Sequence, residues 1–399
     1  MTTVSPLLRR LLTIDVGALS PYPQNDWVMT LFLLSATIYN AKDAALRLVV
    51  MLFFCVAPLV ILLGRPQLRL SKEARPLVLL SALWVLYFLL WFIKNLKDFV
   101  FDFSGPNVEM MTPVLFVTFL YAIPLILNYP PDRLRALLLR YVLLLVPFLF
   151  LELGLRYIQE PNCFLNYSCR FEAKTVGYFS TTNALATSLV TVLLSFFAVG
   201  ALRFRARALL EFILLSSMAR SAIVGYIFGL FLRTIGRLRW STRFAFLTLF
   251  ATAVGVFLYL DPLRLLGDGS ANSKVDFFLS AWDLLFGSDP QAIWFGFGAN
   301  FSSVVETLGV RGWSPHAPIL KAFLYFGVLG VALYLGFIAA VLLTFPQSFI
   351  PMAAFLVLGL AGAPIFFPTL LVMFAVLRAF GEDRQPDHSS VVGRRPLEA

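Results

Sequence analysis

Long apolar runs alternate with short polar segments along most of the chain. A helix needs about 20 mainly apolar residues to cross a bilayer, and nearly every window of that length outside a few loops meets this requirement. Charged or proline-containing breaks divide the runs into about twelve predicted membrane-spanning helices. We therefore predict an all-α, polytopic membrane protein. The predicted ranges are 27–40, 46–63, 76–93, 112–128, 136–156, 182–201, 208–219, 221–232, 244–260, 318–343, 349–363 and 365–380.

The charges of the loops predict an orientation. Cytoplasmic loops of membrane proteins carry an excess of Lys and Arg. If the N-terminus is cytoplasmic, the inward loops are the most basic, with four, three, three and four Lys or Arg residues in 64–75, 130–140, 203–207 and 233–243. The largest outward loop is then 261–316.

Residues 209–232 admit two interpretations. They form either one helix of 24 residues or a hairpin of two short helices, 208–219 and 221–232. A single helix would move the basic segment 233–243 to the outer side, against the charge rule, so we predict the hairpin. Each arm spans only about 18 Å, against about 30 Å of hydrocarbon. Arg220, at the tip, is therefore expected below the outer membrane surface with either interpretation.

The predicted organisation has four parts. Residues 1–260 hold the first nine helices, 261–316 form the large loop, 317–380 hold the last three helices, and 381–399 form a disordered polar tail. Within the loop, "SKVDFFLSAWDLLF" has apolar residues at helical spacing. This stretch predicts an amphipathic helix that lies on the membrane or covers a cavity.

The composition supports a membrane protein and changes how the charge is interpreted. Hydrophobic residues make up 59% of the chain and charged residues only 14%, whereas soluble domains average about half and about a quarter. In a soluble chain, 32 basic residues against 22 acidic ones would indicate nucleic-acid binding. Here the excess is better explained by basic cytoplasmic loops and an anionic ligand, so no nucleic-acid partner is expected.

Arg220 is the first candidate for chemistry, in the stretch "SSMARSA". A charge at membrane depth is costly and usually faces a protein-lined cavity with a partner. The alternatives are a structural ion pair and a side chain that snorkels to the surface. An arginine suits phosphate recognition because its planar guanidinium group donates two parallel hydrogen bonds and stays charged.

His316 and Lys274 are the next candidates. Pro318 fits the first position of a helix, so His316 lies just before a helix start, where the helix dipole disfavours imidazolium and attracts an anion. A neutral histidine there is a plausible general base, although many such histidines are hydrogen-bonded bystanders. Lys274 opens the amphipathic helix, where an anionic ligand or a nearby acid, Asp268 or Asp276, would offset its charge.

Other motifs are absent from the sequence. It contains no His, Cys and Asp cluster with metal-ligand spacing, no phosphate-binding loop of the Walker type and no lipase elbow, so we predict neither a metal nor a cofactor. Cys163 and Cys169 fall in an outward loop, where an oxidising compartment permits a disulfide. Cys55 is expected only to pack within the membrane.

This combination resembles the superfamily of O-antigen ligases and O-antigen polymerases, which are bacterial inner-membrane glycosyltransferases. Members have about a dozen spans, a short hairpin with a Ser/Ala-flanked arginine, and one large periplasmic loop with a basic residue, an amphipathic helix, a Gly-x-Gly turn and a histidine opening the next span. Here the Gly-x-Gly turn is "GFGAN" (296–300), and His316, Ala317, nine residues, Gly327 and Gly330 keep the spacing typical of ligases. The two glycines are expected to let the helix after His316 pack closely. The likeness covers about 182–345.

The resemblance implies an inverting, metal-independent transfer on the periplasmic side of the inner membrane. A glycan would move from undecaprenyl diphosphate to a sugar hydroxyl of lipid A–core. Arg220 and Lys274 would hold the diphosphate, and Arg311 completes the predicted substrate-binding set. His316 would deprotonate or orient the acceptor hydroxyl.

Two positions depart from the family pattern and keep other functions open. Ala317 stands where Asn, Ser or Gln is usual, and Lys274 stands where an arginine is usual. The first alternative is therefore a polymerase of O-antigen or exopolysaccharide, whose acceptor is another lipid-linked repeat unit. An alternative from another class is a transporter for an anionic lipid or solute, with Arg220 in a binding site midway across the membrane. A transporter is expected to show related halves or paired broken helices, and the sequence shows neither.

Overall fold

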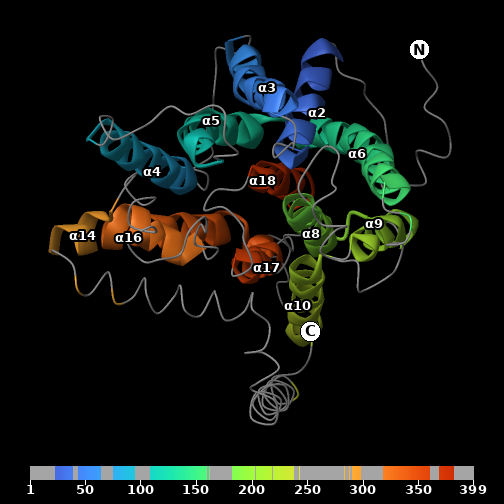
Figure 1. Cartoon of the computed structure of the whole chain (residues 1–399). Helices are drawn as coiled ribbons and strands as arrows, with labels where there is room; N and C mark the ends of the chain where they lie inside the picture. Colours follow the sequence, from blue (N-terminus) through green and yellow to red (C-terminus); the bar gives the residue numbers. More distant parts are fainter. Residues whose placement is uncertain are drawn as a thin grey trace, which may run out of the picture.

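The computed structural model describes residues 23–38, 44–63, 75–94, 108–159, 161, 182–202, 204–217, 219–237, 242, 283, 287, 290–297, 318–359 and 368–381. This part of the chain is almost entirely helical and contains no strand. Figure 1 shows the arrangement of the helices. They are α2 (Pro23–Ile38), α3 (Ala44–Leu63), α4 (Arg75–Lys94), α5 (Val108–Asn128), α6 (Pro131–Gln159), α8 (Thr182–Val199), α9 (Phe204–Ser216), α10 (Arg220–Arg237), α14 (Pro290–Phe295), α16 (Pro318–Thr344), the 3-10 helix η5 (Pro346–Ser348), α17 (Phe349–Gly359) and α18 (Thr369–Phe380).

Helices lie at eleven of the twelve predicted spans, and the all-α class is confirmed. The remaining span, 244–260, lies outside the described residues, as do nearly all of the predicted amphipathic helix and tail. Several boundaries differ from the predicted ones by four or five residues; for example, α6 begins at Pro131, α9 begins at Phe204, α10 ends at Arg237, α17 ends at Gly359 and α18 begins at Thr369. The short helix α14 was not predicted at all.

Two described helices, Pro131–Leu155 and Ala322–Thr344, are long and apolar enough to cross a membrane by length and composition. Several shorter helices expose apolar side chains that water would solvate poorly. The side chains of α3 exposed in this way are Leu48, Val49, Leu52, Val56, Leu59, Val60 and Leu63. A contiguous apolar face of this kind on a helix calls for a lipid or protein neighbour.

The centre of the bundle is α18, which packs against α2, α5, α6 and α8 (Figure 1). Nearly all of its side chains are buried. Buried hydroxyls in the surrounding helices donate to carbonyls of their own helix, as Thr30 does to Asp26 (2.9 Å) and Thr191 to Thr187 (3.0 Å). Such bonds satisfy a polar side chain within an apolar interior.

Inter-helix contacts define one end of the bundle, which we call the basic end. There the Tyr129 hydroxyl at the end of α5 donates to Asp26 at the start of α2 (2.7 Å). Nε of Arg135, near the start of α6, donates to the carbonyl of Ala379 near the end of α18 (2.7 Å). The ring of Phe380 at the end of α18 faces Phe196 near the end of α8.

The other end of the bundle, which we call the opposite end, is formed by the other termini of these helices. The Tyr157 hydroxyl near the end of α6 donates to the carbonyl of Ser216 at the end of α9 (2.7 Å). Thr369, which opens α18, donates to the carbonyl of Ala36 near the end of α2 (3.2 Å) and pairs with Ser188 of α8 (3.0 Å). For these helices, contacts agree with the alternating up-and-down order expected from the loop charges.

Candidate functional site

The structure describes one of the four predicted site residues. Arg220 is the first residue of α10, and its backbone alone is described. His316, Lys274 and Arg311 lie outside the described residues, as do Cys163 and Cys169. The site is therefore built from the elements that position these residues.

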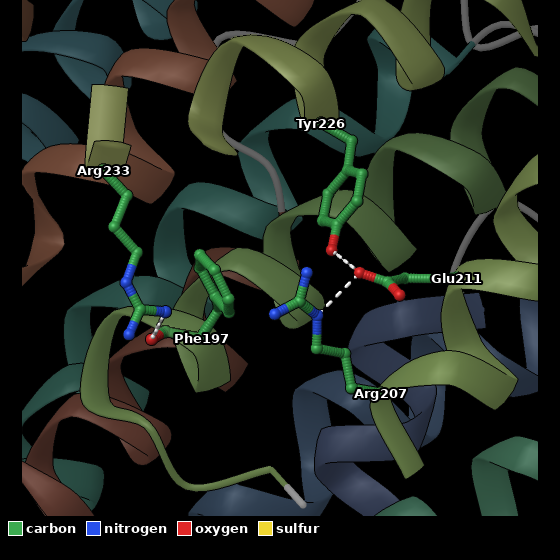
Figure 2. Close-up of polar contacts among 5 residues, drawn as sticks. All are labelled: Phe197, Arg207, Glu211, Tyr226 and Arg233. Atoms are coloured by element: carbon green, nitrogen blue, oxygen red, sulfur yellow. Dashed lines mark hydrogen bonds and ion pairs between the residues drawn. The ribbon is translucent and has the colours of Figure 1, made fainter. Parts of the chain in front are cut away.

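The chain reverses between α9 and α10, as the hairpin interpretation predicts. Two separate helices replace the alternative single helix of 24 residues. Glu211 of α9 is hydrogen-bonded to Tyr226 of α10 (Figure 2), although the two would lie about 22 Å apart in one continuous helix. The helix that begins with Arg220 therefore folds back on α9.

Ser217 shapes the turn before Arg220. Its hydroxyl donates to the carbonyl of Leu214 (2.6 Å) and accepts a hydrogen bond from the N–H of Ala219 (3.3 Å). Ala219 is fully buried, and its carbonyl accepts the hydrogen bond from Ile223 that starts α10 (3.0 Å). Arg220 consequently emerges from a tightly bonded turn rather than from an open loop.

A small cavity of about 30 Å³ lies beside this turn. Ser217 of the turn and Glu152 of α6 contribute its polar lining, and side chains of α8 close it. Glu152 is 5% exposed, and it lies in one of the two helices suited to crossing a membrane. A buried acid in a helix of this kind is a functional candidate. Sequence reasoning missed Glu152, although it is an acid inside the apolar run 136–156.

Glycines set how closely α10 packs on its neighbours. A Cβ at Gly225 would come within 2.6 Å of Leu358 of α17, and a Cβ at Gly229 within 2.6 Å of Leu194 of α8. Helix α17 also contacts α16. The helix that starts with Arg220 and the helix that follows His316 are thus held by a shared neighbour.

The start of α16 agrees with the prediction, and one of its glycines has a further role. Helix α16 begins at Pro318, as expected. Gly327 allows the expected close packing, here against the backbone of Trp294, and it also forms a kink at a positive φ (φ 66°, ψ −163°). L-residues rarely adopt such a φ, so glycine is the residue that permits this break.

The end of α14 packs against the kink in α16. The N–H of Phe297 donates to the carbonyl of Leu324 (2.8 Å). Gly296 (φ 77°) lies so close to Tyr325 that a Cβ would meet its backbone, and a Cβ at Gly327 would meet the backbone of Trp294. The first two residues of the Gly-x-Gly segment, Gly296 and Phe297, are therefore docked at the kink of α16, a contact that no local sequence signal predicts.

Helix α4 supports the kink from another side. The Tyr87 hydroxyl donates to the carbonyl of Phe326 (2.8 Å), and the Trp84 ring packs edge-on against the Phe326 ring. A break in a helix leaves carbonyls to be satisfied by other groups. Tyr87 and Phe297 supply two such donors, so the kink is built into the fold.

No cluster of three or more His, Cys, Asp or Glu residues suited to a metal occurs within the described residues. Cys55 is a free thiol that accepts a hydrogen bond from Thr118 (3.2 Å). Comparison of the chain with protein-family models, curated proteins and solved structures finds no match.

Proposed function

We propose that this protein is a glycosyltransferase of the bacterial inner membrane that transfers a glycan from undecaprenyl diphosphate to a sugar hydroxyl of lipid A–core. The proposal includes about twelve membrane spans and an active site on the periplasmic side. The observation that carries it is the docking of Gly296 against the kink at Gly327. Both glycines belong to the motifs on which the resemblance to O-antigen ligases rests.

This docking supports the proposed position of the base near the start of α16. The hydrogen bond from Phe297 to Leu324 (2.8 Å) closes the intervening chain into a loop anchored on α16. His316 and Arg311 both fall inside that closed segment. The loop is therefore tethered at the end of α16 where His316 precedes the helix, which supports a role for these residues in one site.

The proposed residues divide the chemistry into two tasks. Arg220, Lys274 and Arg311 bind the diphosphate and stabilise the negative charge that grows as it leaves. His316 accepts the proton of the acceptor hydroxyl. A bond forms between the acceptor oxygen and the anomeric carbon while the bond from that carbon to the phosphate oxygen breaks. Attack from the face opposite the leaving group inverts the anomeric centre.

The second candidate is a polymerase that uses another lipid-linked repeat unit as its acceptor. Two residues, Ala317 and Lys274, depart from the ligase pattern, and these departures support the polymerase as a candidate. Deletion of the gene followed by gel analysis of lipopolysaccharide separates the two. Loss of all long-chain lipopolysaccharide, with polymer still on the carrier lipid, identifies a ligase. Core carrying one repeat unit identifies a polymerase, and an unchanged pattern contradicts both.

A further inference from the structure

Helix α14 exposes a pair of aromatic side chains beside the start of α16. It packs on α16 and lies at the end of that helix (Figure 1). Its six residues, "PQAIWF", include no charged residue, and none of them is buried. Trp294 is 53% exposed and Phe295 is 45% exposed. Two adjacent exposed rings differ from the single apolar side chains that are common on protein surfaces, and they call for an apolar neighbour.

Backbone contacts fix the position of this aromatic pair. The N–H of Phe297, two residues after Phe295, donates to the carbonyl of Leu324 (2.8 Å). A Cβ added to Gly327 would come within 2.4 Å of the backbone of Trp294 and within 2.5 Å of the backbone nitrogen of Phe295. The two rings therefore stand on a segment whose backbone is held against the kink of α16.

This contact lies at one end of an apolar helix. Residues Ala322–Thr344 are long and apolar enough to cross a membrane, and Lys321 directly precedes them. Leu324 is only two residues into this stretch, about 3 Å along the helix axis. Just beyond the kink, Val328 and Leu329 are each more than a third exposed. The aromatic pair thus adjoins apolar surface of α16 at the level where a membrane-spanning helix meets the lipid headgroups.

We propose that α14 binds the headgroup and glycerol region of membrane phospholipids through Trp294 and Phe295. Tryptophan is enriched at this level of a bilayer, because its ring contacts the apolar region while its N–H reaches polar groups. Lipid is the occupant that suits this surface, since the surface continues onto a helix that lipid would surround. The inference rests on the membrane placement in the proposed function and not on the transfer reaction. Bound in this way, α14 would hold the large loop, of which it is a part, against the membrane surface.

The test measures the depth of α14 in vesicles of phosphatidylcholine and phosphatidylglycerol that contain the full chain. The three native cysteines are replaced by serine, and a nitroxide spin label is attached at Gln291→Cys or at Leu335→Cys. Gln291 is exposed and lies three and four residues before the two rings, on the same side of α14. Electron paramagnetic resonance then measures collisions of the label with oxygen, which concentrates in the bilayer, and with a nickel chelate, which stays in water.

The ratio of oxygen to nickel collisions at position 291 is expected to lie between the ratio at 335 and that of the label free in buffer. A double variant, Trp294→Ser with Phe295→Ser, is expected to shift the ratio at 291 toward that of the free label. Trp27→Ser is the matched control, because it removes a similarly exposed tryptophan near the start of α2, and it is expected to cause no shift. No shift in the double variant, or an equal shift in the control, contradicts the proposal.

The two label positions separate failure of this inference from failure of the membrane placement. If the label at 335 meets the nickel chelate as freely as the label in buffer does, α16 does not cross the membrane and both are wrong. If 335 lies in the bilayer while 291 behaves like the free label, only the lipid contact of α14 is wrong. A label at 291 that neither reagent reaches would show that protein, such as a second copy of the chain, covers this surface. These readings need no substitution of the aromatic pair, so they decide the question even if the double variant does not fold.

Discussion

The two ends of the bundle are held together by different kinds of contact. At the basic end, cations are held by aromatic rings, carbonyls and acids. For example, Nη1 of Arg140 lies 4.0 Å from Oδ2 of Asp26, and its guanidinium carbon lies 5.4 Å from the ring centroid of Trp27. At the opposite end, the described contacts are mainly hydroxyl and backbone bonds around breaks in the helices. The tight turn before Arg220 belongs to that end.

This difference indicates at which end of the bundle a functional site is expected. Charges at the basic end have partners drawn from several helices, so they fit an architectural role. Backbone breaks in an apolar bundle are tolerated where other groups satisfy them, and they often mark a ligand-binding region. The turn at Ser217 and the kink at Gly327 each lie close in sequence to one of the motifs, around Arg220 and His316 respectively.

The largest difference between the two ends is expected in their accessibility to a reagent that is added from one side of the membrane. After replacement of Cys55, Cys163 and Cys169, a single cysteine is introduced at Ile158, exposed near the end of α6, or at Thr234, exposed at the basic end. An impermeant maleimide added to intact spheroplasts is expected to label position 158 only. Labelling of position 234 before permeabilisation would show that the basic end faces outward and would break the comparison.

The next largest effect is expected for His316→Ala. A positioned acid or base contributes about a hundred- to ten-thousand-fold in rate, so transfer should fall by that factor while donor binding persists. Wild-type activity should also decrease at mildly acidic pH, because imidazolium cannot accept the acceptor's proton. The measurements are initial transfer rates and retention of labelled donor. An active variant, or wild-type activity abolished by chelator and restored by a divalent metal, would contradict the role.

Gly327→Ala tests the kink. The substitution forces an L-residue into a backbone conformation that is essentially restricted to glycine (φ 66°, ψ −163°), which costs about 1–3 kcal/mol, and places a Cβ against the Trp294 backbone. Both unfolding temperature and transfer are expected to fall, because the large loop loses its anchor. Gly336→Ala is the control in the same helix, since its Cβ would meet Leu80 at an ordinary 3.6 Å. Equal behaviour of the two variants would mean that the docking contact is unimportant.

The smallest effect on activity is expected for Tyr129→Phe. The variant removes the hydroxyl that donates to Asp26 at 2.7 Å, a bond to a charged group worth about 1.5–3 kcal/mol. Stability measured by thermal unfolding should fall while the transfer rate of the folded fraction stays at the wild-type value. A loss of transfer without a loss of stability would place catalytic function at the basic end.

Much of the fold followed from local signals, and much of the site did not. Apolar runs and Pro318 predicted where α16 begins, and loop charge correctly favoured the hairpin over a single helix. The kink at Gly327 depends on Phe297 and Tyr87, which are remote in sequence, so glycine spacing alone suggested only close packing. The convergence of Arg207 and Arg233 on Phe197 (Figure 2) also arises from the tertiary arrangement of three helices, which periodicity does not encode.

The central claim is that the end bearing Arg220 carries out glycosyl transfer, and a defined reaction with purified protein tests it most directly. Protein in vesicles is mixed with a glycan linked to undecaprenyl diphosphate and with lipid A–core, and both products are measured by mass spectrometry. We predict glycosylated lipid A–core together with released undecaprenyl diphosphate from wild type, and neither product from Arg220→Ala. Folded wild-type protein that transfers the glycan neither to lipid A–core nor to a lipid-linked repeat unit would contradict the account.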